Sequence, residues 1–189
     1  CRYASGGLQL QGLPQAPFTL PSFQRGLWLF QDEAAQLATL LLQPEPGQQI
    51  LEIGAGRGGK TTHLAQILAG RGTILALDNS SGRLAGLRKN LQRMALTGVE
   101  LLLADAAGPL PMKSERLFDR ILIDAPCSGL GVLRRHPELR WRRQPEDFQW
   151  FARLQAAILA QAAPYLAPGG SIPYITCTTA IQQNELVVQ

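Results

Sequence analysis

The chain has 189 residues, of which 46% are hydrophobic, and its formal net charge is +4. This length and composition predict one globular domain with a sizeable core and exclude a fibrous or disordered class. Three cysteines and two histidines make neither a disulfide framework nor a set of paired metal ligands. We therefore expect a reducing, cytoplasmic setting and no metal. No signal peptide is evident and no apolar run approaches the roughly 18 residues of a membrane span, so no membrane partner is expected.

Residues 1–30 carry Pro14, Pro17 and Pro21 among scattered aromatic residues, which predicts an extended segment or linker. Asp32 follows and is a candidate helix cap. We expect residues 31–189 to form a single domain and the protein to be a monomer.

Within that domain, apolar runs alternate with helical patterns. Strands are predicted at 49–53, 73–77, 99–103, 120–123 and 171–176, and helices at 60–69, 80–95 and 147–166. This alternation predicts a Rossmann-like α/β fold, that is, a mostly parallel sheet with helices on both faces. Residues 182–189 have the pattern of a helix that is just beginning. We therefore expect that the chain is a fragment that lacks the last strands of the sheet.

A glycine-rich octapeptide at 54–61 follows the first predicted strand and matches three nucleotide-binding patterns. It reads as a Walker A loop, as a dinucleotide fingerprint, and, with Glu52, as the loop of an S-adenosylmethionine (SAM) methyltransferase. In each case the glycines allow backbone amides to approach the ligand at the positive end of a helix. The octapeptide alone leaves all three ligands open.

Three consecutive predicted strands end in an aspartate: Asp78, Asp105 and Asp124. In an open parallel sheet the ligand crevice lies beyond the carboxyl ends of the strands, so these acids converge on the glycine loop. Asp78 follows Gly56 at close to the roughly 20-residue spacing of a ribose ligand, and Asp105 is placed to reach an adenine amino group. Strand-end aspartates also cap helices, but three in register favour function. A P-loop leaves Asp78 and Asp105 without a role, although Asp124 ends a Walker B-like strand.

Two cysteines also fall at predicted strand ends. Cys127 follows Asp124 in Asp-Ala-Pro-Cys, and Cys177 follows the last predicted strand in Thr-Cys. A free cysteine is often a small buried hydrophobe, but these two do not fall in the middle of strands. Two thiols are therefore expected to point at one site, and the interpretation as a dinucleotide-binding site does not explain them.

Together with Gly58-Gly59-Lys60-Thr61-Thr62-His63, the two cysteine motifs resemble those of the Sun (Fmu) type RNA 5-methylcytosine methyltransferases. The stretch 131–141 sharpens the resemblance toward bacterial members that methylate a cytosine of small-subunit ribosomal RNA. The resemblance runs from about residue 28 to residue 185. It implies a class I SAM-dependent fold, SAM as the cofactor and RNA as the partner.

The resemblance also implies roles for individual residues. Cys177 is the nucleophile that adds to carbon 6 of cytosine, and Cys127 releases the product. Asp124 contacts the cytosine edge, and Lys60 holds the base or lowers the pKa of Cys177. The implied cofactor site consists of Gly54, Ala55, Gly56, Arg57, Gly58, Gly59, Lys60, Asp78, Asp105 and Asp124.

Five positions depart from the family pattern. The family loop usually reads Cys-Ala-Ala-Pro-Gly-Gly-Lys, whereas this chain has Gly54, Gly56 and Arg57 at the first, third and fourth positions. Thr178 stands where serine is frequent. Pro173 falls inside the predicted strand 171–176, which predicts an edge position for that strand.

Basic residues surround a tryptophan after the Cys127 motif, a composition that suits phosphate binding and base stacking. The predicted RNA-binding residues are Arg134, Arg135, Arg140, Trp141, Arg142 and Arg143. Two other functions stay open at this point. One is a P-loop nucleotide-binding NTPase, and the other is a catalytically silent RNA-binding module.

Overall fold

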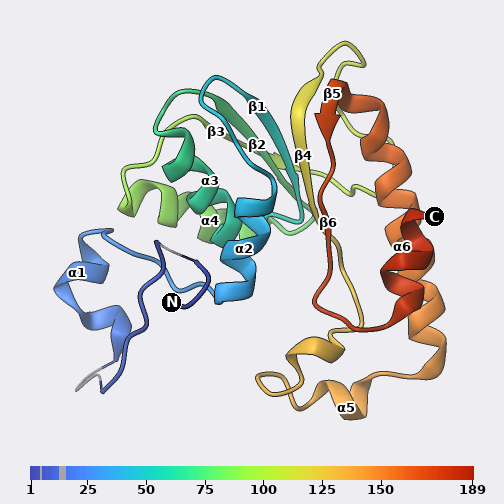
Figure 1. Ribbon diagram of the computed structural model, residues 1–189, viewed down its shortest axis with the longest axis horizontal. Coiled ribbons are helices and arrows are strands. Elements are labelled where there is room, and N and C mark those ends of the chain that lie inside the picture. The colour runs from blue at the N-terminus through green and yellow to red at the C-terminus, as the bar shows by residue number, and fades with distance from the viewer. Residues whose placement is uncertain (5, 13–15) are drawn as a thin grey trace.

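The computed structural model describes residues 1–4, 6–12 and 16–189, so Pro14 lies outside the described residues (Figure 1). Its centre is a parallel sheet in the order β3-β2-β1-β4-β5, and a short strand, β6, also pairs with β4. The strands are β1 Gln49–Ile53, β2 Thr73–Asp78, β3 Val99–Leu103, β4 Phe118–Asp124, β5 Leu166–Ser171 and β6 Tyr174–Ile175. The parallel sheet and its first four strands confirm the sequence prediction.

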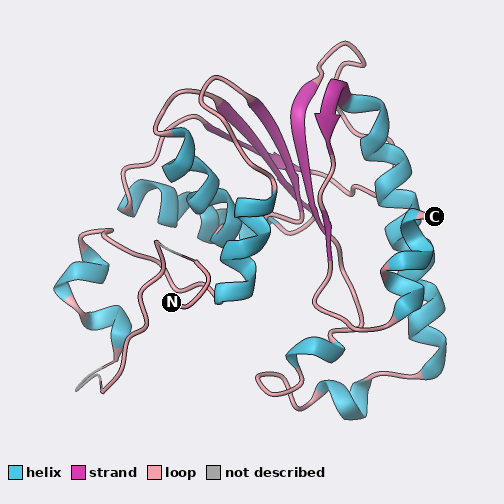
Figure 2. Ribbon diagram, in the orientation of Figure 1, coloured by secondary structure: helices cyan, strands magenta, loops and turns pink. Residues whose placement is uncertain are grey.

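Helices cover both faces of the sheet, as predicted (Figure 2). The α-helices are α1 Pro21–Gln24, α2 Glu33–Leu41, α3 Gly59–Leu68, α4 Ser81–Arg93, α5 Leu139–Arg142, α6 Pro145–Ala162 and α7 Glu185–Val188. Short 3₁₀ turns lie at Pro17–Thr19, Leu130–Val132, Ala163–Tyr165 and Ile181–Gln183. Among the described residues, no helix is both long and apolar enough to cross a membrane.

Alternate residues of the central strands supply two separate cores. Ile50 and Leu122 face α3 and α4, where they pack with Leu64 and Leu87. Their strand neighbours face α6 instead, in a cluster of Leu51, Ile53, Leu75, Leu77, Ile121, Ile123 and Ile158. Because the strands are apolar on both faces, the sheet is stable only when helices cover both sides. The backbone ends of β1, β2 and β4 are thereby held in fixed register at one edge.

The N-terminal segment is less extended than predicted, because it contains the short helix α1 and a 3₁₀ turn. Four of its aromatic rings, those of Phe18, Phe23, Trp28 and Phe30, pack edge to face or tilted against one another. Arg93 at the end of α4 lies 3.9 Å from the Phe23 ring centre and donates to the Phe23 carbonyl. This contact attaches the segment to the domain.

The predicted strand 171–176 is wrong in its bounds. Two strands occur instead, β5 and β6, and Pro173 lies between them and accepts a hydrogen bond from the Ile123 amide at 3.0 Å. The sequence prediction missed β5 because Pro168, Gly169 and Gly170 are typical of a turn. In the described part of the chain β5 and β6 pair with β4. Pro173 thus lies between two strands and not inside one, and its predicted edge position stays a prediction.

The long helix also differs from its predicted range, 147–166. It begins at Pro145, since proline suits the first helical turn, and Asp147 accepts a hydrogen bond from the Gln144 amide. It ends at Ala162, because Pro164 lacks the amide that would continue the ladder. The residues that follow are thereby released to form β5.

Candidate active site

The glycine loop leaves β1 at Ile53 and ends where α3 begins. Its Gly54 and Ala55 amides both donate to the Leu77 carbonyl at the end of β2, at 2.9 and 3.0 Å. Gly54 has φ +81°, and an added Cβ would overlap the Asp124 carbonyl oxygen. Glycine is therefore required where the ends of three neighbouring strands meet.

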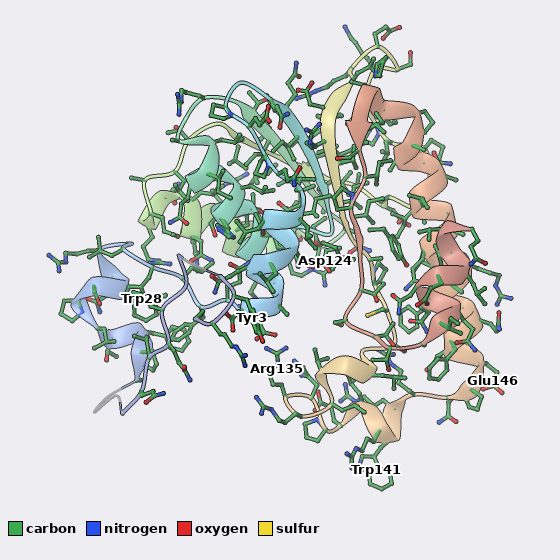
Figure 3. The ribbon with its side chains drawn as sticks, viewed as in Figure 1. Tyr3, Trp28, Asp124, Arg135, Trp141 and Glu146 are labelled. Carbon is green, nitrogen blue, oxygen red and sulfur yellow. The ribbon has the colours of Figure 1, made fainter. Side chains whose placement is uncertain are left out.

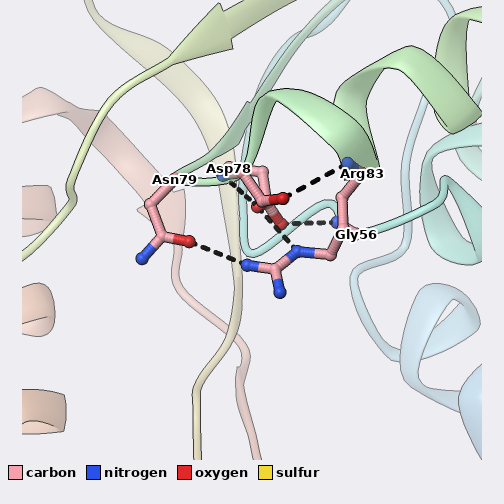
Figure 4. A network of polar contacts seen from close by, with 5 residues as sticks. Gly56, Asp78, Asn79 and Arg83 are labelled. Atoms are coloured by element: carbon pink, nitrogen blue, oxygen red, sulfur yellow. Dashed lines mark hydrogen bonds and ion pairs between the residues drawn. The ribbon is translucent and has the colours of Figure 1, made fainter.

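Asp78 at the end of β2 binds the glycine loop itself (Figure 4). Its carboxylate accepts from the Gly56 amide at 2.9 Å, from the Ser80 amide at 2.8 Å and from Arg83 Nε at 2.8 Å. Arg83 also donates to the Asn79 side chain at 2.7 Å. Only 4% of the Asp78 side chain is exposed. This aspartate shapes the loop, whatever ligand it contacts.

Asp105, at the end of the next strand, has different surroundings. It is exposed, and one of its oxygens accepts from the Ala107 amide at 3.0 Å. The other oxygen has no protein donor among the described residues. A carboxylate in this position is available to a ligand amino group beyond the sheet edge.

Lys60 and Asp124 form an ion pair at 2.5 Å between the start of α3 and the end of β4. The lysine side chain is 13% exposed and the aspartate side chain 35% exposed, so one face of the pair is open to solvent. The pKa of Cys177 is raised above its ordinary value, first by the Cys127 thiol and then by burial. The predicted effect of Lys60 on this thiol stays a prediction, and the contact that the lysine makes is with Asp124.

The two predicted thiols lie together. Cys127 Sγ and Cys177 Sγ are 3.1 Å apart, Cys177 is exposed and Cys127 is half-buried. A hydrogen bond from the Cys177 thiol lowers the pKa of Cys127 to about 7 from an ordinary 9.0. Because the two sulfurs share a proton, the pair carries one thiolate near neutral pH and retains the second proton.

Buried polar groups fasten the loops that carry the two thiols. The Ser128 and Thr178 hydroxyls lie 2.7 Å apart. The Ser128 amide donates to the Gln183 side chain at 2.8 Å, and Gln155 Nε2 donates to the Pro126 carbonyl at 2.7 Å. Sequence reasoning missed this set. The available signal was a glutamine at position 155 on the apolar face of a long helix.

Only part of the predicted RNA-binding cluster faces outward. Arg134, Arg140, Trp141 and Arg142 are exposed, and Trp141 lies at the outer edge of α5 (Figure 3). Arg135 is also exposed, but it pairs with Asp32 at 2.8 Å, and Asp32 makes no side-chain cap to α2.

Arg143 is turned inward, which differs from the prediction. It donates to the Ser128 carbonyl at 2.9 Å and to the Cys127 carbonyl at 3.4 Å, and it lies 4.8 Å from the Phe151 ring centre. Sequence alone does not separate Arg142 from Arg143, because charge density carries no information about which way each side chain points. Arg143 thus stabilises the Cys127 loop through two of its backbone carbonyls.

Among the described residues, several buried polar atoms near the glycine loop have no hydrogen-bond partner, and two of them belong to Gln31 and Glu52. Gln31 Nε2 has no hydrogen-bond partner among the described residues, and a Cβ added to Gly59 would lie 3.9 Å from it. Glu52 in β1 is fully buried, its Oε2 atom is likewise unpartnered, and burial raises its pKa to about 7. The sequence indicates Glu52 only as part of the glycine-loop pattern, and it does not indicate Gln31 at all. Asp32, the helix-cap candidate that follows Gln31, does not indicate that the Gln31 side-chain amide is buried.

The geometry of the glycine loop argues against the hypothesis that it is a P-loop that binds nucleotide phosphates and magnesium. Thr61, the residue that would hold magnesium, is 0% exposed, and Lys60 pairs with Asp124 instead of reaching over the loop.

SAM fits the residues that are present. The first two amides of α3, at Gly59 and Lys60, have no intrahelical acceptor and suit a carboxylate. The exposed Asp105 carboxylate suits an adenine amino group, and the Gln31 amide is a buried donor with no partner in the part of the chain that the structure describes. Arg57 is exposed on the outer side of the loop.

Comparison with known proteins agrees with this geometry. Residues 39–189 match a family model described as 16S rRNA methyltransferase RsmB/F. A probable ribosomal RNA small subunit methyltransferase B of Synechocystis is 39% identical over 183 residues, which cover 97% of this chain and 41% of the relative. The ribosomal RNA small subunit methyltransferase B of Vibrio cholerae is 42% identical over 170 residues, 90% of this chain and 39% of the relative. The chain thus spans about two fifths of these relatives.

Solved structures show the same fold. The crystal structure of NSun6 from Pyrococcus horikoshii with SFG has a TM-score of 0.84 and 34% identity, over 93% of this chain and 44% of that one. PH0851 has a TM-score of 0.88 at 34% identity, over 93% and 40% of the two chains. A SAM-dependent O-methyltransferase from Thermotoga maritima, at 16% identity over 85% of this chain and 49% of that one, shares the fold alone, with a TM-score of 0.59.

Proposed function

Because the chain belongs to the RsmB/F family of 16S rRNA methyltransferases, we propose that its protein methylates carbon 5 of a cytosine in RNA, with ribosomal RNA as the substrate. The observation that carries this proposal is the thiol pair. Cys127 and Cys177 stand 3.1 Å apart beside the Lys60–Asp124 pair. Methyl transfer to nitrogen or oxygen has no use for two such thiols.

Cys177 is the nucleophile in this proposal. Carbon 5 of cytosine is a weak nucleophile, and addition of a thiolate to carbon 6 makes it enamine-like. Bound SAM supplies an electrophilic methyl group. The raised pKa of Cys177 means that it gives up its proton only to a base, and the Cys127 sulfur, 3.1 Å away, is within reach to accept it.

Cys127 then serves in product release. After methyl transfer, loss of the carbon 5 proton and elimination of the thiol restore the aromatic ring. A thiol next to Cys177, with a pKa of about 7, is suited to exchange protons with the leaving Cys177 sulfur. Without Cys127, the covalent complex is expected to accumulate.

Asp124 and Lys60 serve the base. The Asp124 carboxylate is partly open to solvent and hydrogen-bonds the cytosine edge, which stabilises the positive charge that develops on addition. Lys60 fixes the carboxylate orientation from its other side. In the same proposal Asp78 serves the ribose of SAM and Asp105 its adenine, while the 54–60 loop surrounds the methionine end.

RNA contacts are assigned to the outward residues Arg134, Arg140, Trp141 and Arg142. Arg135 joins them when phosphate displaces Asp32. The target cytosine leaves its stack to reach the thiols, so a single-stranded or loop cytosine is the substrate. We further propose that the protein acts as a monomer in the reducing cytoplasm.

Trapping tests this function. The full-length protein is incubated with SAM and RNA that contains 5-fluorocytosine, which lacks the carbon 5 proton needed for release. A covalent complex resistant to denaturation is expected, and Cys177→Ala abolishes it. Cys127→Ala is expected to accumulate the complex on ordinary RNA. RNA binding without any complex would instead indicate a silent binding module.

A further inference from the structure

The two thiols of the site are placed to react with each other as well as with RNA. Their sulfurs are 3.1 Å apart, and a disulfide needs them at about 2.05 Å. The sulfurs are therefore about 1 Å farther apart than in a disulfide bond. In the described part of the chain both cysteines are free.

The backbone around the pair holds this arrangement. The Ala125 amide donates to the Ile175 carbonyl, and the Gly131 amide donates to the Cys177 carbonyl, both at 2.9 Å. With the Ser128–Thr178 hydroxyl bond at 2.7 Å, these bonds tie the two loops together on both sides of the thiols. The two loops, and with them the two sulfurs, are therefore held next to each other.

We propose that Cys127 and Cys177 are a site of reversible oxidation, in which a hydroperoxide closes them into a disulfide and switches the site off. The loss of activity rests on the proposed function, whereas disulfide formation does not. Closing the pair removes the nucleophile and the release thiol at once, while the glycine loop stays untouched.

One hydroperoxide supplies the two-electron oxidation that converts the two thiols into a disulfide. The Cys127 thiolate attacks an oxygen of the peroxide, so an S–O bond forms, the O–O bond breaks and an alcohol or water leaves. The Cys177 sulfur then attacks the oxidised sulfur, an S–S bond forms, and hydroxide leaves as water with the Cys177 proton. Two thiols are oxidised by two electrons in total, and the peroxide is reduced. A dithiol reverses the disulfide by exchange.

Access and charge favour this reaction over oxidation of an isolated thiol. Cys177 is exposed and Cys127 is half-buried, so a small peroxide reaches both. The hydrogen bond between them favours one thiolate near neutral pH. The second sulfur traps the first oxidation product before it is oxidised further.

The test uses the full-length protein with Cys1→Ser, a change outside the site. It is treated with hydrogen peroxide near neutral pH, alkylated and cleaved with trypsin. The expected product joins peptide 121–134 to the peptide that begins at Leu154, and dithiothreitol separates them. RNA methylation is expected to fall by roughly an order of magnitude or more and to return with dithiothreitol, while SAM binding by calorimetry is unchanged.

Controls separate the possible outcomes. Cys127→Ser and Cys177→Ser each remove the linked peptides, and in the wild type the oxidation rate of Cys1 gives the reference for an exposed thiol. Sulfinic acid on either cysteine without linkage, or linkage no faster than Cys1 oxidation, would overturn the proposal. Linked peptides in a protein whose reduced form does not methylate RNA would leave the disulfide standing and refute the proposed function.

Discussion

The Ser128 and Thr178 hydroxyls lie 2.7 Å apart, buried, and each sits directly after one of the two cysteines. This bond joins the loop that follows β4 to the loop that follows β6. It therefore fixes the separation of the thiols through their own chain neighbours. Thr178 was noted in the sequence only as a departure from a frequent serine, and either residue type supplies the hydroxyl that the contact needs.

Thr178→Val is expected to disturb the thiol pair, whereas Thr178→Ser is not. Valine keeps the shape but leaves the Ser128 hydroxyl buried without a partner, at a cost of about 1–3 kcal/mol. Urea unfolding measures the stability, and single-turnover trapping on 5-fluorocytosine RNA measures the rate of adduct formation. Equal trapping rates for the two variants would show that the hydroxyl bond does not position the cysteines.

Arg142 and Arg143 are expected to behave differently, although they are neighbours of the same type. Arg143→Ala removes the donor to the Ser128 carbonyl and the contact with Phe151, so the melting temperature should fall by several degrees. Arg142 is exposed, so Arg142→Ala should leave the melting temperature unchanged. It should weaken RNA binding and lower the salt slope by about one.

Thermal melting and RNA titration at several salt concentrations check this pair. The idea fails if both variants lose only RNA affinity, because Arg143 would then act at the surface as the sequence suggested.

The contrast between these arginines shows where sequence reasoning stops. The alternation of strands and helices predicts a parallel sheet. In a parallel sheet the carboxyl ends of the strands lie on the same side, so Asp78, Asp105 and Asp124 come together there regardless of their side-chain rotamers. Side-chain direction in a loop has no such periodicity. Arg143 points inward and donates to carbonyls of the Cys127 loop. Those carbonyls are within its reach only after β4 and α6 have packed.

Long-range partners are equally hidden. Asp32 looked like a helix cap, yet its carboxylate pairs with Arg135, 103 residues away. β5 was missed because a proline and two glycines are typical of a turn, yet this segment pairs with β4. In both cases a local pattern was outweighed by a contact that the tertiary structure creates.

Asp78 and Asp105 are expected to separate folding from cofactor binding. Asp78 accepts three hydrogen bonds while nearly buried, so Asp78→Ala should destabilise the protein by about 1–3 kcal/mol and weaken SAM binding. Asp105 is exposed, so Asp105→Ala should weaken SAM binding by roughly tenfold at unchanged stability.

Calorimetric titration with SAM and urea unfolding without it make this comparison. An unchanged SAM affinity in Asp105→Ala would remove that residue from the adenine site. An unchanged stability in Asp78→Ala would show that the loop does not depend on its carboxylate.

The thiol pair is expected to react with alkylating reagents at a lower pH than an ordinary cysteine. The Cys177 thiol lowers the pKa of Cys127 to about 7, so the alkylation rate should rise as the pH increases through about 7. Cys177→Ala removes the donated hydrogen bond and should shift this midpoint upward, toward the ordinary 9.0. Mass spectrometry of iodoacetamide-treated protein follows residue 127. An identical midpoint in the variant would mean that the two sulfurs are not coupled.

Glu52 is expected to make the protein less stable as the pH rises. Its carboxyl is fully buried and its pKa is raised to about 7 from an ordinary 4.5. Between these two values the folded protein holds a proton that the unfolded chain has lost, so the free energy of unfolding decreases with pH. The decrease is complete above about pH 7 and amounts to about 3 kcal/mol.

Glu52→Gln removes this ionisation and keeps the shape of the side chain. The variant should match the wild type at about pH 3.5, below the ordinary pKa, and exceed it by up to about 3 kcal/mol at about pH 8, measured by urea unfolding. SAM is left out, because a ligand that binds only the folded state adds its own stabilisation. Glu100→Gln is the matched control, since Glu100 is exposed and pairs with Arg116 at the surface, and its effect should stay within about 1 kcal/mol at both pH values. If the difference between Glu52→Gln and the wild type were the same at both pH values, the buried carboxyl would not titrate in this window, and its unpartnered Oε2 would have to be satisfied in another way.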